Sequence, residues 1–253
     1  MPTKSARASL RSSDVRRSAR KQVATLGKGK SSVPPTDRRA YIIKRATERI
    51  AKHGFGATSV RQIADDVDIL SGSLYHHFAT KEEILHEIVK DAVVRLHDET
   101  LRITSSGADP ETKIVALVLF ELGELVEKHQ VHAILYNERK LFRNSAEFSD
   151  VRAAKTVIYH AWRSVLEAGM DGGQFDARLD LYLMIRTIMR MLNSAADWYA
   201  SGDETLARVV EMYSFEDVKT FYLRFILGAI RDPGRVDAAV PREEAERLVA
   251  AAG

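Results

Sequence analysis

Apolar residues recur along this chain at intervals of three and four, the spacing that places side chains on one face of a helix. Beyond Pro35 the only prolines are Pro110, Pro233 and Pro241, and strict alternation of apolar and polar residues, as in a strand, is absent. Long proline-free stretches that are rich in helix formers favour long helices. The pattern therefore predicts an all-α fold.

Helix-start and helix-stop residues divide this pattern into elements. Ser59-x-x-Gln62 and Thr80-x-x-Glu83 are capping boxes, and Asp109-Pro110-Glu111 combines an N-cap, a first-turn proline and a first-turn acid. Gly54 ends the first helix. The predicted helices cover about residues 36–53, 59–67, 71–78, 80–105, 109–130, 131–142, 148–169, 179–200 and 215–230. Glu121 falls on the same stripe of its helix as the apolar residues Leu117 and Leu125.

Charge is distributed unevenly along the chain, whose net charge is +3. Residues 1–33 hold nine basic residues and one acidic residue, whereas acidic residues outnumber basic ones in the remainder. Segments of this composition do not bury enough apolar surface to fold, and a basic arm favours a polyanionic partner. We expect a disordered basic arm (1–35), a DNA-binding domain (36–98), an effector-binding and dimerisation domain (99–232) and a C-terminal tail (233–253).

The segment from Ser59 to Phe78 carries the clearest functional signal. Two short helices separated by a turn of three to four residues form a helix-turn-helix, whose second helix can enter the major groove of DNA. Leu70, Leu74 and Phe78 are spaced to face the core, so the outer face of this helix is small and polar. Ser59 and Lys81 are candidates for phosphate contacts, and Arg61 for a guanine edge. The candidates on the second helix are Ser71, Gly72, Ser73, Tyr75 and His76.

This segment resembles the DNA-binding domain of TetR-type bacterial transcriptional regulators. The resemblance rests on four pieces: Thr58-Ser59-Val60-Arg61, Ile63-Ala64, Gly72-Ser73-Leu74-Tyr75-His76-His77-Phe78 and Lys81-Glu82-Glu83. It implies that Thr58 also lies at the DNA interface, that the protein is a homodimer, and that it binds a palindromic operator and is released by a small ligand. Most members of the family begin near the first helix, whereas about 35 residues precede it here.

The segment from Ile69 to Phe78 is similar to the corresponding segment of actinobacterial repressors of lipid and steroid catabolism. That likeness implies an acyl-CoA thioester or another hydrophobic acid as the effector. The helices 179–200 and 215–230 are expected to form the dimer interface, where Ser194-Ala195-Ala196 and Gly228-Ala229 are small enough for close approach.

Aromatic and basic residues recur at helical spacing in the second half of the chain. They are Tyr136, Arg139, Phe142, Tyr159, Trp162, Arg186, Met189, Arg190 and Asn193. One interpretation is core aromatics with surface arginines. The other is an apolar pocket between helices in which arginines hold a carboxylate or phosphate. Arg186 and Arg190 favour the second, because they interrupt an apolar run at a spacing of four.

Other classes of function lack support in the sequence. The chain has no cysteine, no apolar run long enough to span a membrane, and no G-x-S-x-G or H-E-x-x-H motif. His129-x-x-His132 lacks a third ligand and is interpreted as a pair of surface histidines. We therefore expect neither an enzyme nor a bound metal or cofactor, and a cytoplasmic, nucleoid-associated regulator. The alternative is a helical lipid- or acyl-binding protein without DNA activity.

Overall fold

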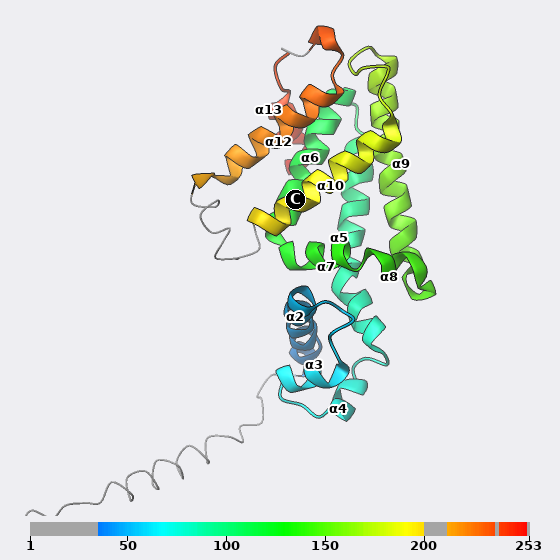
Figure 1. The fold of residues 1–253 in the computed structure, drawn as a ribbon, viewed down its shortest axis with the longest axis vertical. Helices are drawn as coiled ribbons and strands as arrows, with labels where there is room; N and C mark the ends of the chain where they lie inside the picture. Colours follow the sequence, from blue (N-terminus) through cyan, green and yellow to red (C-terminus); the bar gives the residue numbers. More distant parts are fainter. Residues whose placement is uncertain (1–34, 200–211, 236–237, 252–253) are drawn as a thin grey trace, which may run out of the picture. The chain divides into compact units, whose positions relative to one another are not determined.

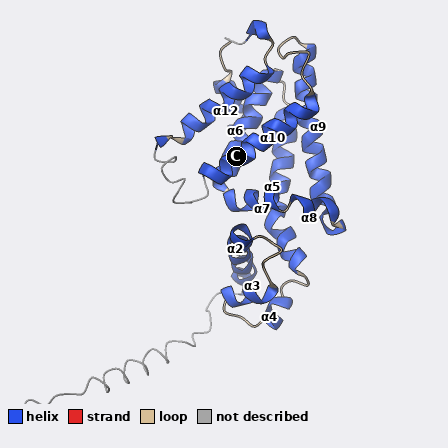
Figure 2. Cartoon of the chain, viewed as in Figure 1, coloured by secondary structure: helices blue, strands red, loops and turns tan. Residues whose placement is uncertain are grey.

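Helices make up the regular structure of the protein (Figure 2). A computed structural model describes residues 35–199, 212–235 and 238–251. Within those ranges the only β-type pairing is one isolated bridge between Phe175 and Arg231, which confirms the predicted all-α class. Contacts divide the chain into two units, Met1–Ala40 and Tyr41–Gly253. The predicted basic arm lies almost wholly outside the described residues.

Figure 1 shows the helices of the described residues in chain order. They are α2 (Pro35–His53), α3 (Val60–Asp66), α4 (Ser71–Tyr75), α5 (Lys81–Thr104), α6 (Pro110–Glu127), α7 (His129–Asn137), α8 (Arg139–Asn144), α9 (Ser149–Asp171), α10 (Leu181–Tyr199), α12 (Phe215–Ile230) and α13 (Arg242–Ala250). Helix α13 lies in the segment that was expected to be a tail, and it packs on α6.

Local capping explains where several helices begin. Both hydrogen bonds of the capping box are formed: the Ser59 hydroxyl accepts from the backbone N of Gln62, and the Gln62 side chain accepts from the backbone N of Ser59. The Asp109 carboxylate accepts hydrogen bonds from the backbone N atoms of Glu111 and Thr112. At Thr80 the hydroxyl accepts from the backbone of Glu83, but the Glu83 carboxylate accepts from the backbone N of Ala79 at 2.6 Å instead of from Thr80. Each of these helices starts within about one residue of its predicted position.

Two clusters of buried apolar side chains hold the elements in place. The first joins α2–α5 to α7, α8 and the start of α9, and it contains Phe78, Phe142 and Phe148. The second lies among α6, α9, α10, α12 and α13, and Trp162 is one of its largest buried members. The first cluster therefore packs the helix-turn-helix directly against helices that follow residue 128.

Two predicted helices and the predicted burial of one residue differ from the structure. The helix predicted over 131–142 is two helices, because the chain turns at Glu138, which ends α7 and precedes α8. Helix α4 stops at Tyr75 rather than at Phe78. Leu70 was expected to face the core with Leu74 and Phe78, but it is 80% exposed. It stands before the first turn of α4 in an extended conformation, so the spacing of the helix does not apply to it.

Gly169 in α9 provides a test of the packing in the second cluster. A Cβ atom at this position would lie 2.1 Å from Cδ2 of Phe175, whereas one at Gly123 in α6 would have no neighbour within 4 Å. We expect Gly169→Ala to lower the free energy of unfolding by about 1–3 kcal/mol through overpacking. We expect Gly123→Ala, the matched control, to raise it by up to about 1 kcal/mol through helix propensity. Urea unfolding of both variants decides this, and equal stability of the two would contradict the described packing.

Candidate nucleic-acid interface and ligand cavity

The exposed side of the helix-turn-helix is built by the burial of its opposite side. Leu74 and Phe78 lie in the first apolar cluster and fix the orientation of α4. The Arg61 side chain is 84% exposed on α3, and its Nε lies 4.0 Å from an oxygen of Asp65. Tyr75 is 53% exposed. The remaining candidates on α4 divide into two groups: Gly72 and His76 are exposed, and Ser71 and Ser73 are half-buried.

Five of the predicted DNA-binding residues, Thr58 among them, border one shallow hollow on this surface. Ser59 and Arg61 come from the start of α3, Tyr75 from the end of α4, and Lys81 from the start of α5. Three helices that are separated along the chain therefore present polar groups to one place. The hydroxyl of Ser59 caps α3, because it accepts a hydrogen bond from the backbone N of Gln62 at 3.2 Å.

Thr58 and Lys81 hold the loop before α3 rather than facing solvent freely. Thr58 is buried, and its hydroxyl donates to the carbonyl oxygen of Gly54 at 2.9 Å. The Lys81 ammonium donates to the carbonyl oxygens of Phe55 and Thr58, both at 2.9 Å, and lies 4.0 Å from the centre of the Phe55 ring. The Thr58 hydroxyl is thus engaged within this loop, where the chain buries Phe55, and a contact of Thr58 with DNA stays a prediction.

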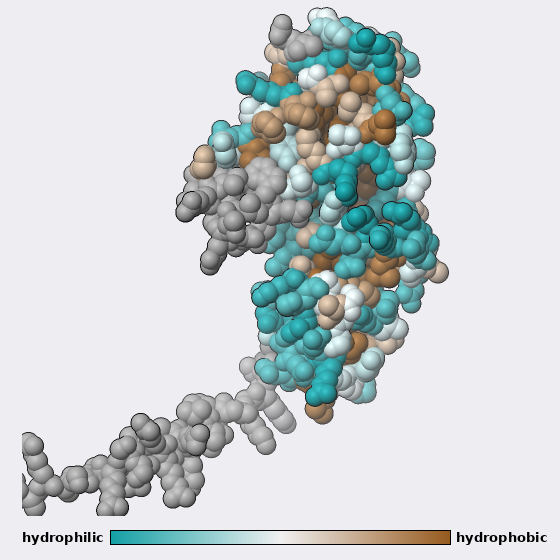
Figure 3. All heavy atoms as spheres, in the orientation of Figure 1, coloured by the Kyte–Doolittle hydropathy of each residue, from teal (hydrophilic) through white to brown (hydrophobic). Residues whose placement is uncertain are grey.

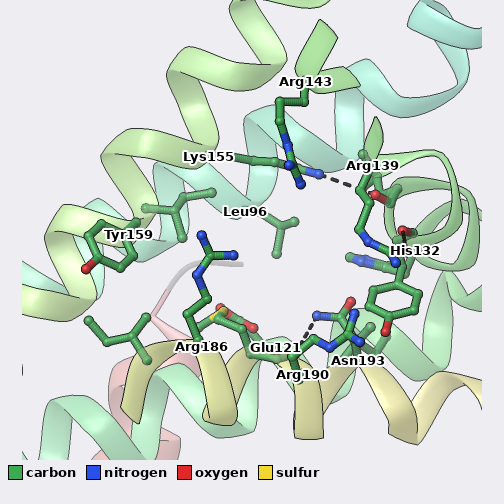
Figure 4. A pocket seen from close by; sticks show the side chains of 16 residues that line it. Leu96, Glu121, His132, Arg139, Arg143, Lys155, Tyr159, Arg186, Arg190 and Asn193 are labelled. Carbon is green, nitrogen blue, oxygen red and sulfur yellow. Dashed lines mark hydrogen bonds between the residues drawn. The ribbon is translucent and has the colours of Figure 1, made fainter. Parts of the chain in front are cut away.

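A cavity of about 490 Å³ lies among α5, α6, α7, α8, α9 and α10 (Figure 4). Seven of the nine predicted ligand-binding residues line it: Tyr136, Arg139, Tyr159, Arg186, Met189, Arg190 and Asn193. Arg143 and Lys155 add two further cations, and Figure 4 shows the basic side chains approaching a shared space beside Leu96. A volume of this size suits a small ligand. Its basic lining suits an anionic one.

Aromatic rings position three of these arginines. The guanidinium carbon of Arg190 lies 5.0 Å from the centre of the Tyr136 ring, and that of Arg186 lies 4.8 Å from the Tyr182 ring. Arg139 also contacts Tyr136, at 5.1 Å from its ring, and donates to its carbonyl oxygen at 3.1 Å. Both α10 arginines are exposed side chains at the edge of the cavity rather than members of the apolar core.

Phe142 and Trp162 do not line the cavity, contrary to their assignment as ligand-binding residues. Phe142 packs edge-on against Phe148 at 5.0 Å in the first apolar cluster. Trp162 is fully buried, and its indole Nε1 donates to Oε1 of Glu121 at 3.2 Å. Both side chains support the walls of the cavity from behind.

Two polar residues of the cavity were not predicted as site residues. Burial raises the pKa of the Glu121 carboxyl to about 7, although the hydrogen bond from Trp162 acts in the opposite direction. His132 is 4% exposed, so the interpretation of this histidine as a surface residue is wrong, and its burial lowers its pKa to about 4. The position of Glu121 on an apolar stripe was a signal for it in the sequence. No metal-binding group of three or more His, Asp or Glu side chains occurs in the described part of the chain.

Glu138 connects the cavity to the helix-turn-helix. Its neighbours Tyr136 and Arg139 line the cavity, while its own Oε1 accepts a hydrogen bond from the backbone N of Phe55 at 2.8 Å. Gly54, just before Phe55, has φ of +82°, and a Cβ there would lie 3.5 Å from the same oxygen. The loop that leads to Ser59 is therefore held by Glu138 through its N–H and by Lys81 through its carbonyl groups.

None of the helices in the described ranges is long and apolar enough to cross a membrane.

Comparison with known proteins identifies the two halves separately. Residues 42–88 match the family model for bacterial regulatory proteins of the tetR family, and residues 107–214 match that for the tetracyclin repressor-like C-terminal domain. The first match spans the helix-turn-helix, and the second includes every residue of the cavity lining except Leu96.

Relatives of known sequence and structure cover most of the chain. The HTH-type transcriptional repressor KstR2 of Rhodococcus jostii (strain RHA1) is 31% identical over 207 residues, which are 79% of this chain and 98% of the relative. KstR2 of Mycobacterium tuberculosis (strain H37Rv) is 31% identical over 198 residues, 78% of this chain and 94% of that protein. The structure of the ketosteroid transcriptional regulator KstR2 of Mycobacterium tuberculosis aligns with a TM-score of 0.68 and 29% identity, covering 81% of this chain and 98% of that one.

Proposed function

Because the chain belongs to the TetR family of bacterial transcriptional regulators, we propose that it is a repressor released from its operator by an anionic, hydrophobic effector. Members of this family are DNA-binding regulators rather than enzymes, which removes the alternative of a lipid-binding protein without DNA activity. The observation that carries the effector proposal is the cavity, which combines an apolar wall with five basic side chains. The place of action would be the cytoplasm, at the nucleoid.

The exposed polar groups around α4 support a role in reading the operator. Gly72 lets the backbone approach the DNA closely, Arg61 can bind a guanine edge, and Tyr75 can contact phosphate or a thymine methyl group. In a two-fold dimer these surfaces would meet half-sites about 34–36 Å apart, and the operator would be palindromic.

A stripe of exposed residues on α12 supports the dimer. Phe221 and Phe225 are large, exposed and stacked with ring centres 6.2 Å apart, and Gly228 and Ala229 continue the same face. Figure 3 shows apolar surface in the region of α10 and α12. An exposed apolar stripe of this kind is typical of an interface. Ala195 of α10, expected at the interface, is buried inside the subunit, and the side chain of Ala196 lies outside the described residues.

The effector class that fits the cavity is an acyl-CoA thioester or another hydrophobic acid. Apolar residues such as Leu125, Leu135 and Ile185 would contact the acyl part, and the exposed arginines would pair with carboxylate or phosphate oxygens. The basic groups come from three helices, α8, α9 and α10, so a bound anion would draw these helices together.

Replacing the arginines of α10 tests this assignment. We expect Arg186→Ala or Arg190→Ala to raise the decanoyl-CoA concentration needed for half-release of the operator by about 10- to 150-fold, since hydrogen bonds to charged groups contribute about 1.5–3 kcal/mol. Operator affinity without effector should stay unchanged. Fluorescence anisotropy of labelled operator measures both quantities. Arg178→Ala, an exposed arginine that pairs with Asp176 and does not line the cavity, is the control. An effector response equal to wild type in both α10 variants would refute the anchor.

Glu138 would transmit the effector signal, because its carboxylate binds the backbone N of Phe55 while Tyr136 and Arg139, close to it along the chain, line the cavity. We expect Glu138→Ala to leave the affinity for decanoyl-CoA within about twofold, but to reduce its effect on operator affinity by about 2- to 30-fold, as for other residues along a coupling path. Isothermal titration gives the first quantity and anisotropy the second. Glu127→Ala, an exposed glutamate at the end of α6, is the control. Unchanged coupling in Glu138→Ala would contradict this route.

A further inference from the structure

One large apolar side chain on the helix-turn-helix is not explained by packing. Leu70 is 80% exposed, more than any other large apolar side chain of the described residues. Single exposed apolar residues are common on protein surfaces, so exposure alone does not indicate a function. The place of Leu70 does, because this residue directly precedes α4, the helix that is proposed to enter the major groove.

The turn between α3 and α4 sets the direction of this side chain. Asp68 adopts the left-handed conformation, with φ of +54°, and the backbone N of Ile69 donates to the carbonyl oxygen of Ala64 at 3.0 Å, as in the Schellman motif that ends many helices. Ile69 packs against the first apolar cluster. Leu70 is extended, and successive side chains of an extended chain point to opposite sides. Leu70 therefore faces outward because Ile69 faces inward.

The backbone of Leu70 is held in place by α4. Its carbonyl oxygen accepts hydrogen bonds from the backbone N atoms of Ser73 and Leu74, at 2.9 and 3.3 Å, and Leu74 is buried in the first apolar cluster. Gly72, two residues after Leu70, is exposed, and a Cβ atom there would have no neighbour within 4 Å. The Leu70 side chain is thus presented from an ordered backbone beside open space, so a contact with DNA requires little further ordering of the chain.

A leucine can recognise one feature of a base pair in the major groove. Its side chain neither donates nor accepts hydrogen bonds, whereas guanine, cytosine and adenine present only donors and acceptors there. Thymine also presents its C5-methyl group, which apolar side chains contact. The exposed side chains of Arg61, Tyr75 and His76 all carry polar groups, so they do not duplicate what Leu70 offers.

We propose that Leu70 selects a thymine in each operator half-site by packing against the C5-methyl group of that base. The proposal rests on the proposed function, since it requires a specific operator. It assigns part of the sequence choice to an apolar residue of the turn, in addition to the polar face of α4. Burial of one methyl group corresponds to about a fourfold change in affinity per half-site.

The test replaces thymine by deoxyuridine, which pairs with adenine in the same way and lacks only the methyl group. The duplex comes from the region upstream of the protein's own gene, and each symmetry-related pair of thymines is replaced in turn. Anisotropy with the full chain should show one pair whose replacement weakens wild-type binding by about 15-fold, which is about fourfold in each half-site, because separated contacts are roughly additive. In Leu70→Ala the same replacement should change affinity by less than about twofold, since the methyl group has lost its partner. The unmodified duplex should bind Leu70→Ala about as weakly as the deoxyuridine duplex binds wild type.

Two further variants distinguish Leu70 from other residues. Leu101→Ala removes an exposed leucine of α5 that does not border the hollow, so it should keep the wild-type response to the methyl group. Tyr75→Ala should bind every duplex more weakly but should keep the same ratio between the thymine and deoxyuridine duplexes. Truncation of the exposed Leu70 side chain removes little packing, and circular dichroism checks that the variant is folded.

The outcomes separate this inference from the proposed function. If no deoxyuridine replacement weakens wild-type binding, or if the response to the methyl group survives in Leu70→Ala, the inference is overturned and the repressor proposal stands. A response that is lost in Tyr75→Ala and kept in Leu70→Ala would assign the methyl contact to Tyr75 and also overturn it. If wild type binds the upstream duplex no more tightly than scrambled DNA, the proposed function is wrong and the inference fails with it.

Discussion

Replacing Arg61 or Tyr75 by alanine is expected to weaken operator-specific binding while leaving the folded dimer intact. Both side chains are mostly exposed, so truncation removes little packing. The loss of one bidentate contact to a base costs about 1–3 kcal/mol, which corresponds to a 5- to 150-fold weaker complex. Anisotropy with operator and scrambled duplexes separates specific from non-specific binding.

Lys90→Ala serves as the control for this pair. Lys90 is an exposed cation on α5 and does not border the hollow formed by Ser59, Arg61, Tyr75 and Lys81. Its replacement should change operator affinity by less than about twofold, since surface substitutions away from a site are nearly neutral. If both Arg61→Ala and Tyr75→Ala bind operator like wild type, a different face of the domain reads the DNA.

Replacing Arg231 by methionine is expected to lower the free energy of unfolding by about 3–5 kcal/mol, the cost of leaving a buried charge without its partner. The Arg231 guanidinium pairs with both carboxylate oxygens of Glu111, at 2.6 and 3.1 Å, and both side chains are at most 5% exposed. It also donates to the carbonyl oxygens of Ala238 and Ala239, at 2.6 and 3.0 Å. One side chain thus joins the start of α6, the end of α12 and the segment that leads to α13.

The double variant Glu111→Leu/Arg231→Met separates pairing from packing. Removing both charges leaves no unpaired ion, so most of the stability lost in Arg231→Met should return. Urea unfolding of the wild type, the single variant and the double variant measures the difference. A double variant no more stable than the single one would show that the carbonyl groups near Ala238, not the charge on Glu111, determine the cost.

Helix positions were predictable because their signals are local. Caps such as Ser59 and Asp109 use side chains and backbone atoms within three residues, so the sequence alone identifies them. The turn at Glu138 has no such signal. Its carboxylate bonds to the backbone of Phe55, 83 positions earlier, and neither glycine nor proline marks the break between α7 and α8.

Helical spacing predicted which site residues share a face of one helix, but it could not predict how the helices pack together. Spacing correctly placed Arg186, Met189 and Arg190 on one face of α10, and all three line the cavity. Helical spacing does not show which helix lies opposite a given face. Trp162 was therefore predicted to bind the ligand, although its indole instead donates a hydrogen bond to Glu121. Spacing also made His132 a surface residue, because a neutral histidine in a ligand cavity and a solvated one have the same sequence pattern.

Operator binding and its release are tested together by titrating the full chain against labelled duplex DNA from the region upstream of its own gene, with and without decanoyl-CoA. We expect specific binding with a dissociation constant of about 10⁻⁸ M or tighter, at least about a thousandfold preference over scrambled duplex, and release by decanoyl-CoA. Equal affinity for operator and scrambled duplex, or operator binding that decanoyl-CoA does not weaken, would contradict the proposed ligand-released repressor.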